Sequence, residues 1–71
     1  MIAVPESRRC RVRAHECRTA AERLRVPDAR DQMLRVADYY ERMARDAEQR
    51  EIAQGLSHLR SLAVGRAIQA A

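Results

Sequence analysis

Apolar residues in the middle of the chain recur with the spacing of an α-helix. Between positions 28 and 51 they cover an arc of about 120° at about 100° per residue, the width of a stripe that faces a core. The positions are Ala29, Met33, Val36, Ala37, Tyr40, Met43, Ala44 and Ala47. The pattern predicts one long amphipathic helix over residues 28–53.

The opposite face of this helix is charged, with acids placed four residues before arginines. The pairs are Asp31 with Arg35, Asp38 with Arg42, Glu41 with Arg45, and Asp46 with Arg50. Pairs of this order and spacing stabilise an isolated helix. We therefore expect the outer face to promote helix formation without contacting the core.

The segment before it carries a stripe of small residues at helical spacing. These are Cys10, Ala14, Cys17, Ala20 and Ala21, followed by the larger Leu24. They predict a first helix over residues 5–25, with Pro5 in its first turn. Small side chains let a neighbouring helix approach closely, so we expect the larger Met33, Tyr40 and Met43 to fill the space opposite.

Pro27 breaks the helical pattern between these two segments. It forces Val26 toward an extended conformation and can itself open the next helix. A connection this short makes consecutive helices antiparallel neighbours. The sequence thus predicts an all-α antiparallel helical hairpin.

The last part of the chain keeps helical spacing but on a different side. Its apolar positions are Ile52, Leu56, Leu59 and Ala63, and their stripe is rotated by about 120° from that of the second helix. Either Gly55 ends the second helix and a third helix follows over residues 57–69, or one helix continues and turns this face to a second chain. We favour the break, and take Leu56 and Leu59 as candidate interaction residues.

A chain of 71 residues forms a single small domain, residues 1–71, with little core of its own. Its aromatic residues are Tyr39 and Tyr40. Tyr40 belongs to the core stripe, and Tyr39, at the stripe's edge, is a candidate for a contact between chains. We expect a partner chain, with hairpins assembling into a homo-oligomeric helix bundle.

The net charge of +4 comes from arginine alone, because the chain has no lysine. The first helix is basic and the second mildly acidic, so the two should attract each other. Arg8, Arg9, Arg11 and Arg13 form a cluster that could bind phosphates, with Arg9 and Arg13 as candidate contacts. The chain lacks a helix-turn-helix pattern and aromatic residues between the arginines, which argues against nucleic-acid binding.

Cys10 and Cys17 lie on one face of the first helix, two turns apart. Their separation of about 10.5 Å along the axis exceeds the reach of a disulfide. We expect two small buried thiols, with an intermolecular disulfide as the alternative. His15 and Cys17 point in different directions and cannot share a metal ion, so no metal or cofactor is expected.

No glycine-rich phosphate loop and no nucleophile beside a recognisable base occurs in the sequence, so we do not expect an enzyme. The N-terminus lacks the features of a secretory signal, and no apolar run approaches the roughly 18 residues needed to span a bilayer. A cytoplasmic protein with free thiols is the expectation.

The pattern of the hairpin resembles that of a group of short, uncharacterised helical-hairpin proteins common in alphaproteobacteria. The residues that carry the resemblance are Arg13, Ala14, Glu16, Cys17, Arg18, Ala21, Pro27, Arg30, Leu34, Ala37, Tyr40, Met43, Ala44, Ala47 and Glu48. The chain departs from the pattern at Ala20, Val26 and Met33. The resemblance implies the hairpin, and a structural partner for Glu16 such as Arg30 or Arg35, but no activity.

Two functions from different classes follow. The first is a non-catalytic interaction or scaffold protein that acts through self-association of its helices. The second is a small nucleic-acid-binding regulator that uses the arginine cluster. A salt titration separates them, because phosphate binding weakens steeply with salt and apolar helix packing does not.

Overall fold

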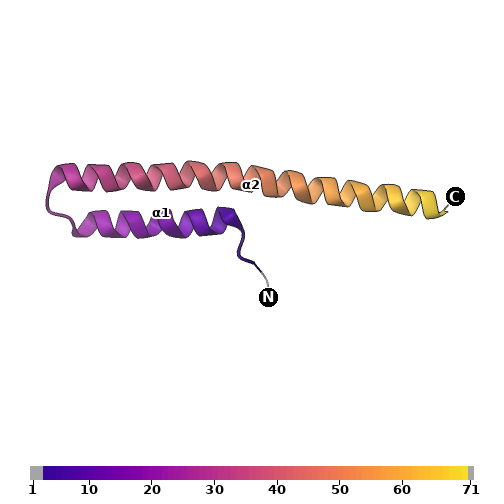
Figure 1. Ribbon diagram of the computed structural model, residues 1–71, viewed down its shortest axis with the longest axis horizontal. Helices are drawn as coiled ribbons and strands as arrows, with labels where there is room; N and C mark the ends of the chain where they lie inside the picture. Colours follow the sequence, from indigo (N-terminus) through magenta and orange to yellow (C-terminus); the bar gives the residue numbers. More distant parts are fainter. Residues whose placement is uncertain (1–2, 71) are drawn as a thin grey trace.

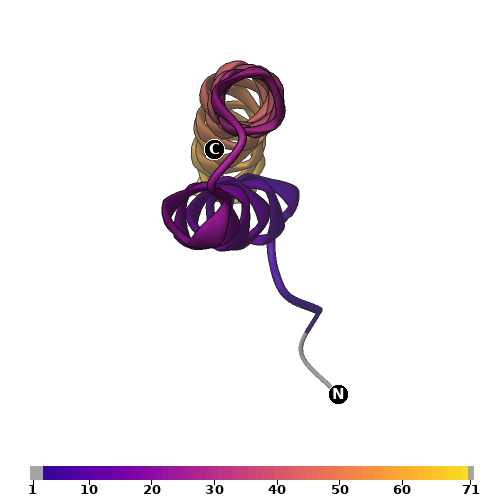
Figure 2. The same cartoon turned by 90° about the vertical axis from the view of Figure 1, so that its left-hand side faces the viewer.

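The computed structural model describes residues 3–70 and the side chains of residues 3–66. Two helices make up this part of the chain, α1 (Glu6–Arg23) and α2 (Pro27–Ala70). They lie antiparallel, side by side (Figure 1), and Figure 2 shows them end-on as one pair. The Cα positions extend over 68 × 23 × 10 Å. The all-α hairpin predicted from the sequence is therefore present, and it is a single helix pair.

The turn between the helices is short and is closed by one arginine. Leu24 follows α1 in an extended conformation, with its N–H donating to the Ala21 carbonyl at 3.1 Å. The Arg30 guanidinium donates to the Leu24 carbonyl, at 2.8 Å from Nη2 and 3.3 Å from Nε. An early residue of α2 thus satisfies a carbonyl that the end of α1 leaves exposed.

The core between the helices consists of small side chains. The buried apolar residues among the described ones are Cys10, Ala14, Ala21, Ala37, Ala44 and Ala47. Ala14 and Ala21 are seven residues apart, as are Ala37 and Ala44, which is the repeat of a coiled coil. A small residue at a repeated seam position lets two helices pack closely, as the sequence predicted.

The prediction that large residues of the second helix fill the core was wrong. Met33, Tyr40 and Met43 are only half-buried, and Cys17, expected to be buried, is half-buried as well. The alanine seam brings the helices too close for large side chains to lie between them, so these flank the seam instead. Tyr40 packs edge-to-face on Tyr39, with ring centroids 5.8 Å apart.

The predicted break at Gly55 is absent, and α2 continues through it. Neither glycine of the chain has a positive φ, which a helix-terminating glycine would require. An interior glycine costs a helix about 1 kcal/mol relative to alanine, too little to end a run of good helix formers. Residues 57–69 therefore form the end of α2 and not a third helix. We call residues 52–70 the extension, which runs past the start of α1 (Figure 1).

The ion pairs predicted along α2 are not formed by the described residues. Asp38 and Glu41 contact Arg18 of α1 instead, and Arg50 contacts Glu6 of α1. These acids lie beside the basic first helix, which offers them arginines across the interface. The uneven distribution of charge therefore stabilises the hairpin and not α2 alone.

Candidate interaction surface

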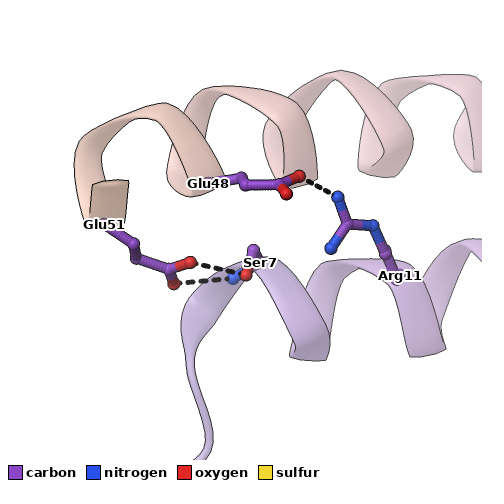
Figure 3. A network of polar contacts seen from close by, with 4 residues as sticks. All are labelled: Ser7, Arg11, Glu48 and Glu51. Atoms are coloured by element: carbon purple, nitrogen blue, oxygen red, sulfur yellow. Dashed lines mark hydrogen bonds and ion pairs between the residues drawn. The ribbon is translucent and has the colours of Figure 1, made fainter. Parts of the chain in front are cut away.

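A group of polar contacts fastens the start of α1 to α2 where the extension begins (Figure 3). The Ser7 hydroxyl donates to Glu51 Oε2 at 2.6 Å, and the Ser7 backbone N–H donates to Glu51 Oε1 at 3.2 Å. One turn further along α1, Arg11 forms an ion pair with Glu48. We call Ser7, Arg11, Glu48 and Glu51 the clasp.

Glu51 acts as the N-terminal cap of a helix to which it does not belong. Pro5 precedes α1 and makes no side-chain capping bond, so the first N–H groups of α1 need another acceptor. The Glu51 carboxylate supplies one, and its negative charge lies at the positive end of the α1 dipole. The two hydrogen bonds from Ser7, hydroxyl first, hold the pKa of Glu51 below its usual range.

A second anchor lies near the middle of the hairpin. Arg18 of α1 donates to Glu41 at 2.7 Å and lies 3.7 Å from Asp38. The hydrogen bond from Arg18, together with its charge, lowers the pKa of Glu41, and the same hydrogen bond raises the pKa of Arg18. The hairpin is therefore held by one anchor near its middle, and by the clasp and the Arg50–Glu6 ion pair at its open end.

The seam that α2 presents to α1 becomes polar beyond the clasp. Steps of seven residues from Ala37 and Ala44 lead to Glu51, then to His58 and Gly65. The parallel series from Ala47 leads to Gln54 and Ser61. The face of the extension that continues the α1 contact is thus unsuited to packing another apolar helix.

A different face of the extension is apolar and uncovered. Ile52, Leu56, Leu59 and Ala63 follow one another at intervals of four, three and four residues, so they align along one side of the helix. Ile52, Leu56 and Leu59 are 51%, 59% and 62% exposed. We call these four residues the extension stripe. Leu62, at its margin, is 53% exposed.

The extension stripe does not continue along the hairpin. At about 100° per residue, the four positions of α2 that continue its line immediately before Ile52 are Asp38, Glu41, Arg45 and Glu48; the exposed Leu34, which is also in line, lies beyond these charges. These four residues are charged, and three of them pair with arginines of α1. The stripe is therefore a local feature of residues 52–63.

The structure places the sequence-predicted interaction residues on three separate surfaces. Leu56 and Leu59 lie in the extension stripe, and both are exposed. Tyr39 is 59% exposed but lies on the hairpin, about 26 Å from Leu56 along α2 at 1.5 Å per residue. Arg9 and Arg13 lie on α1, where both are exposed. The five residues do not form one site.

The arginine cluster at the start of α1 is partly engaged. Arg11 pairs with Glu48 in the clasp, and Arg13 pairs with Glu16 at 3.4 Å. Glu16 thus contacts its own helix, and the prediction that it contacts Arg30 or Arg35 was wrong. Arg8 and Arg9, with Val4, Val12 and Arg13, line a shallow surface depression.

The clasp was not identified from the sequence. Ser7 and Glu51 are 44 residues apart in the sequence, and Glu51 has no neighbouring motif that marks it as a cap. The signal that could have found it is the seven-residue repeat. Ser7 lies seven residues before Ala14, and Glu51 lies seven residues after Ala44. In an antiparallel hairpin these two positions lie at the same end of the helix pair.

The cysteines and other metal-ligand side chains form no further site in this part of the chain. Cys10 is buried, Cys17 is half-buried, and both are free thiols. Among the described residues no three His, Cys, Asp or Glu side chains are grouped to hold a metal ion. Neither described helix combines the length and apolar character required to cross a membrane.

Comparison of the chain with protein-family models, with curated proteins and with solved structures finds no match.

Proposed function

We propose that the protein is a non-catalytic helical interaction protein that acts by self-association, and that the extension stripe is its association surface. The observation that carries the proposal is the exposure of Ile52, Leu56 and Leu59, each more than half exposed, on a helix that runs past the start of α1. A row of large aliphatic side chains on one helix face favours packing against another helix.

The composition of the hairpin core supports the proposal. Its buried residues are alanines, Cys10 and Ser7, and no large side chain is fully buried. Burial of apolar surface contributes about 25 cal/mol per Å², so a core of methyl groups contributes little. Covering the larger side chains of the extension adds the apolar burial that the hairpin lacks.

Charge placed on the stripe tests the proposal. The variant Leu56→Glu/Leu59→Glu puts two carboxylates on the stripe, and Ser57→Glu/Ser61→Glu puts the same two charges on the other side of the same segment. In sedimentation velocity at micromolar concentration, the first variant should be monomeric. The control should keep the sedimentation coefficient of the native protein, because its carboxylates stay in water.

Circular dichroism establishes that both variants remain helical. Equal sedimentation coefficients for the two variants would mean that the extension stripe is not the association surface. A native protein that binds DNA or RNA oligonucleotides with an affinity falling steeply between 50 and 200 mM salt would instead favour the arginine cluster of α1.

A further inference from the structure

We infer that the partner of the extension stripe is the stripe of a second copy, laid antiparallel, with the two-fold axis between Leu56 and Leu59. This inference rests on the proposed self-association and adds its geometry. It is carried by the spacing of the stripe, by the sizes of its residues and by the position of the charges at its ends.

The spacing of the stripe is the same in both directions. Its intervals of four, three and four residues read identically from Ile52 and from Ala63. A second copy turned by 180° therefore places its Leu59 level with Leu56 and its Ala63 level with Ile52. The two leucines of each copy meet at the centre, and at each end an isoleucine faces an alanine, which suits interdigitated packing. A two-fold axis of this kind is the usual symmetry of a homodimer.

Charge favours this direction over the parallel one. Among the described residues the extension carries Arg60 and Arg66 and no acid. In the antiparallel pair, Arg66 is level with Gln49 of the second copy and beside its Glu48, whose side chain is 44% exposed in the clasp. Arg60 is level with Gly55, which has open space around it. Each guanidinium thus lies away from its counterpart in the second copy, and Arg66 lies beside a carboxylate that also pairs with Arg11.

In a parallel, in-register pair the same arginines would meet each other. Arg66 lies seven residues beyond Leu59, so it occupies a seam position of the repeat and would face Arg66 of the second copy. Arg60 flanks the seam and would likewise lie level with its counterpart. Like charges in these positions destabilise a helix pair.

Distances between spin labels test the direction. A full-length Cys10→Ala/Cys17→Ala protein receives one cysteine at a time, at Ser57, Asp46 or Arg42, which are exposed positions of α2. Pulsed electron paramagnetic resonance then measures the separation of two labels on the same residue of two copies. Because each residue rises about 1.5 Å along both helices, the axial separation grows by about 3 Å for each residue away from the two-fold axis.

The antiparallel pair predicts labels level with each other along the axis at Ser57, about 35 Å apart axially at Asp46, and about 47 Å apart at Arg42, so the measured distance increases from site to site. A separation that stays the same across the three sites means a parallel pair. That result would overturn this inference while leaving self-association intact. Absence of any intermolecular distance at concentrations up to 100 μM would overturn both the inference and the proposed function.

The unlabelled Cys10→Ala/Cys17→Ala protein must have the sedimentation coefficient and melting temperature of the native chain, which shows that its hairpin is intact.

Charge reversal at Arg66, matched by the same change at Arg60, gives a second measurement. Arg66→Glu places an acid beside Glu48 of the second copy and should weaken association at least tenfold, whereas Arg60→Glu should change it less. Equal weakening by the two substitutions would contradict the pairing of Arg66 with Glu48.

Discussion

Ser7 is the one buried polar side chain among the described residues, 6% exposed, and both its hydrogen bonds go to Glu51. The hydroxyl and the backbone N–H approach different oxygens of one carboxylate. This geometry satisfies a backbone N–H at the start of α1. Together with the ion pairs Arg11–Glu48 and Arg50–Glu6, it joins the two helices where the extension begins.

Replacing Ser7 by alanine removes one of these bonds and keeps the small size that the seam requires. Ser7→Ala should lower the free energy of unfolding by about 1.5–3 kcal/mol, the usual contribution of a hydrogen bond to a charged group. Ser57→Ala, at an exposed position of the extension, should change it by less than about 0.5 kcal/mol. Urea denaturation at fixed protein concentration measures both. Equal stability of the two variants would mean that the clasp does not stabilise the hairpin.

The alanines of the seam are expected to tolerate no larger side chain. Ala14 is fully buried in the seam, so a larger side chain there must force the helices apart. Ala14→Leu should destabilise the protein by about 1–3 kcal/mol, as overpacking does. The same substitution at exposed Ala53 should have little effect on thermal unfolding. A more stable Ala14→Leu protein would show that the seam has room for a leucine.

Among the elements, α2 is longer than α1 because nothing in its local sequence requires the helix to end beside the start of α1. Pro27 is the first residue of α2 and was identified from the sequence as a possible helix start, since its fixed φ suits the first turn of a helix. The predicted helix end at Gly55 was wrong, because a glycine of this kind ends a helix only where its φ is positive. Whether it does so depends on tertiary contacts that a local pattern does not contain.

Gly55→Ala distinguishes a continuous helix from a broken one by the sign of its effect. A Cβ atom at Gly55 would have no neighbour within 4 Å, and its backbone is helical. In a continuous helix the substitution should raise helicity and stabilise α2 by up to about 1 kcal/mol. Circular dichroism during thermal unfolding measures this. A loss of stability would indicate that Gly55 adopts a left-handed conformation and ends the helix.

The contact between the two helices depends on ionised carboxylates. The pKa values of Glu41 and Glu51 are lowered in the folded protein by Arg18 and Ser7. The stabilisation they provide is therefore complete above the unfolded glutamate pKa of about 4.3 and is lost as the pH falls through their lower folded values. The melting temperature should stay nearly constant from pH 7 to 5 and decline at lower pH.

Ser7→Ala isolates the part of this decline that belongs to the clasp. Without the hydroxyl donor the pKa of Glu51 returns toward its ordinary value, so the variant should lose less stability on acidification than the native protein does. Thermal unfolding followed from pH 7 to 2.5 makes the comparison. Parallel curves for the two proteins would mean that Glu51 does not contribute to the acid sensitivity.

At the scale of the whole molecule, the sequence predicted the helical hairpin and the rotated stripe of residues 52–63, because both follow from periodicity along one helix. The contacts across the hairpin were less predictable. Glu16 pairs within α1, and the acids of α2 pair with Arg11 and Arg18. Which partner a charged residue selects depends on the register of the two helices, and an alanine repeat of period seven fits several registers equally well.

Self-association would account for both the sparse core of the hairpin and the exposed apolar face of the extension. Sedimentation equilibrium of the native chain from 1 to 200 μM measures it. A self-associating protein should show a weight-average mass that rises with concentration toward at least twice the 8.1 kDa of one chain. A mass that stays at one chain throughout, with the protein still unfolding cooperatively, would contradict self-association.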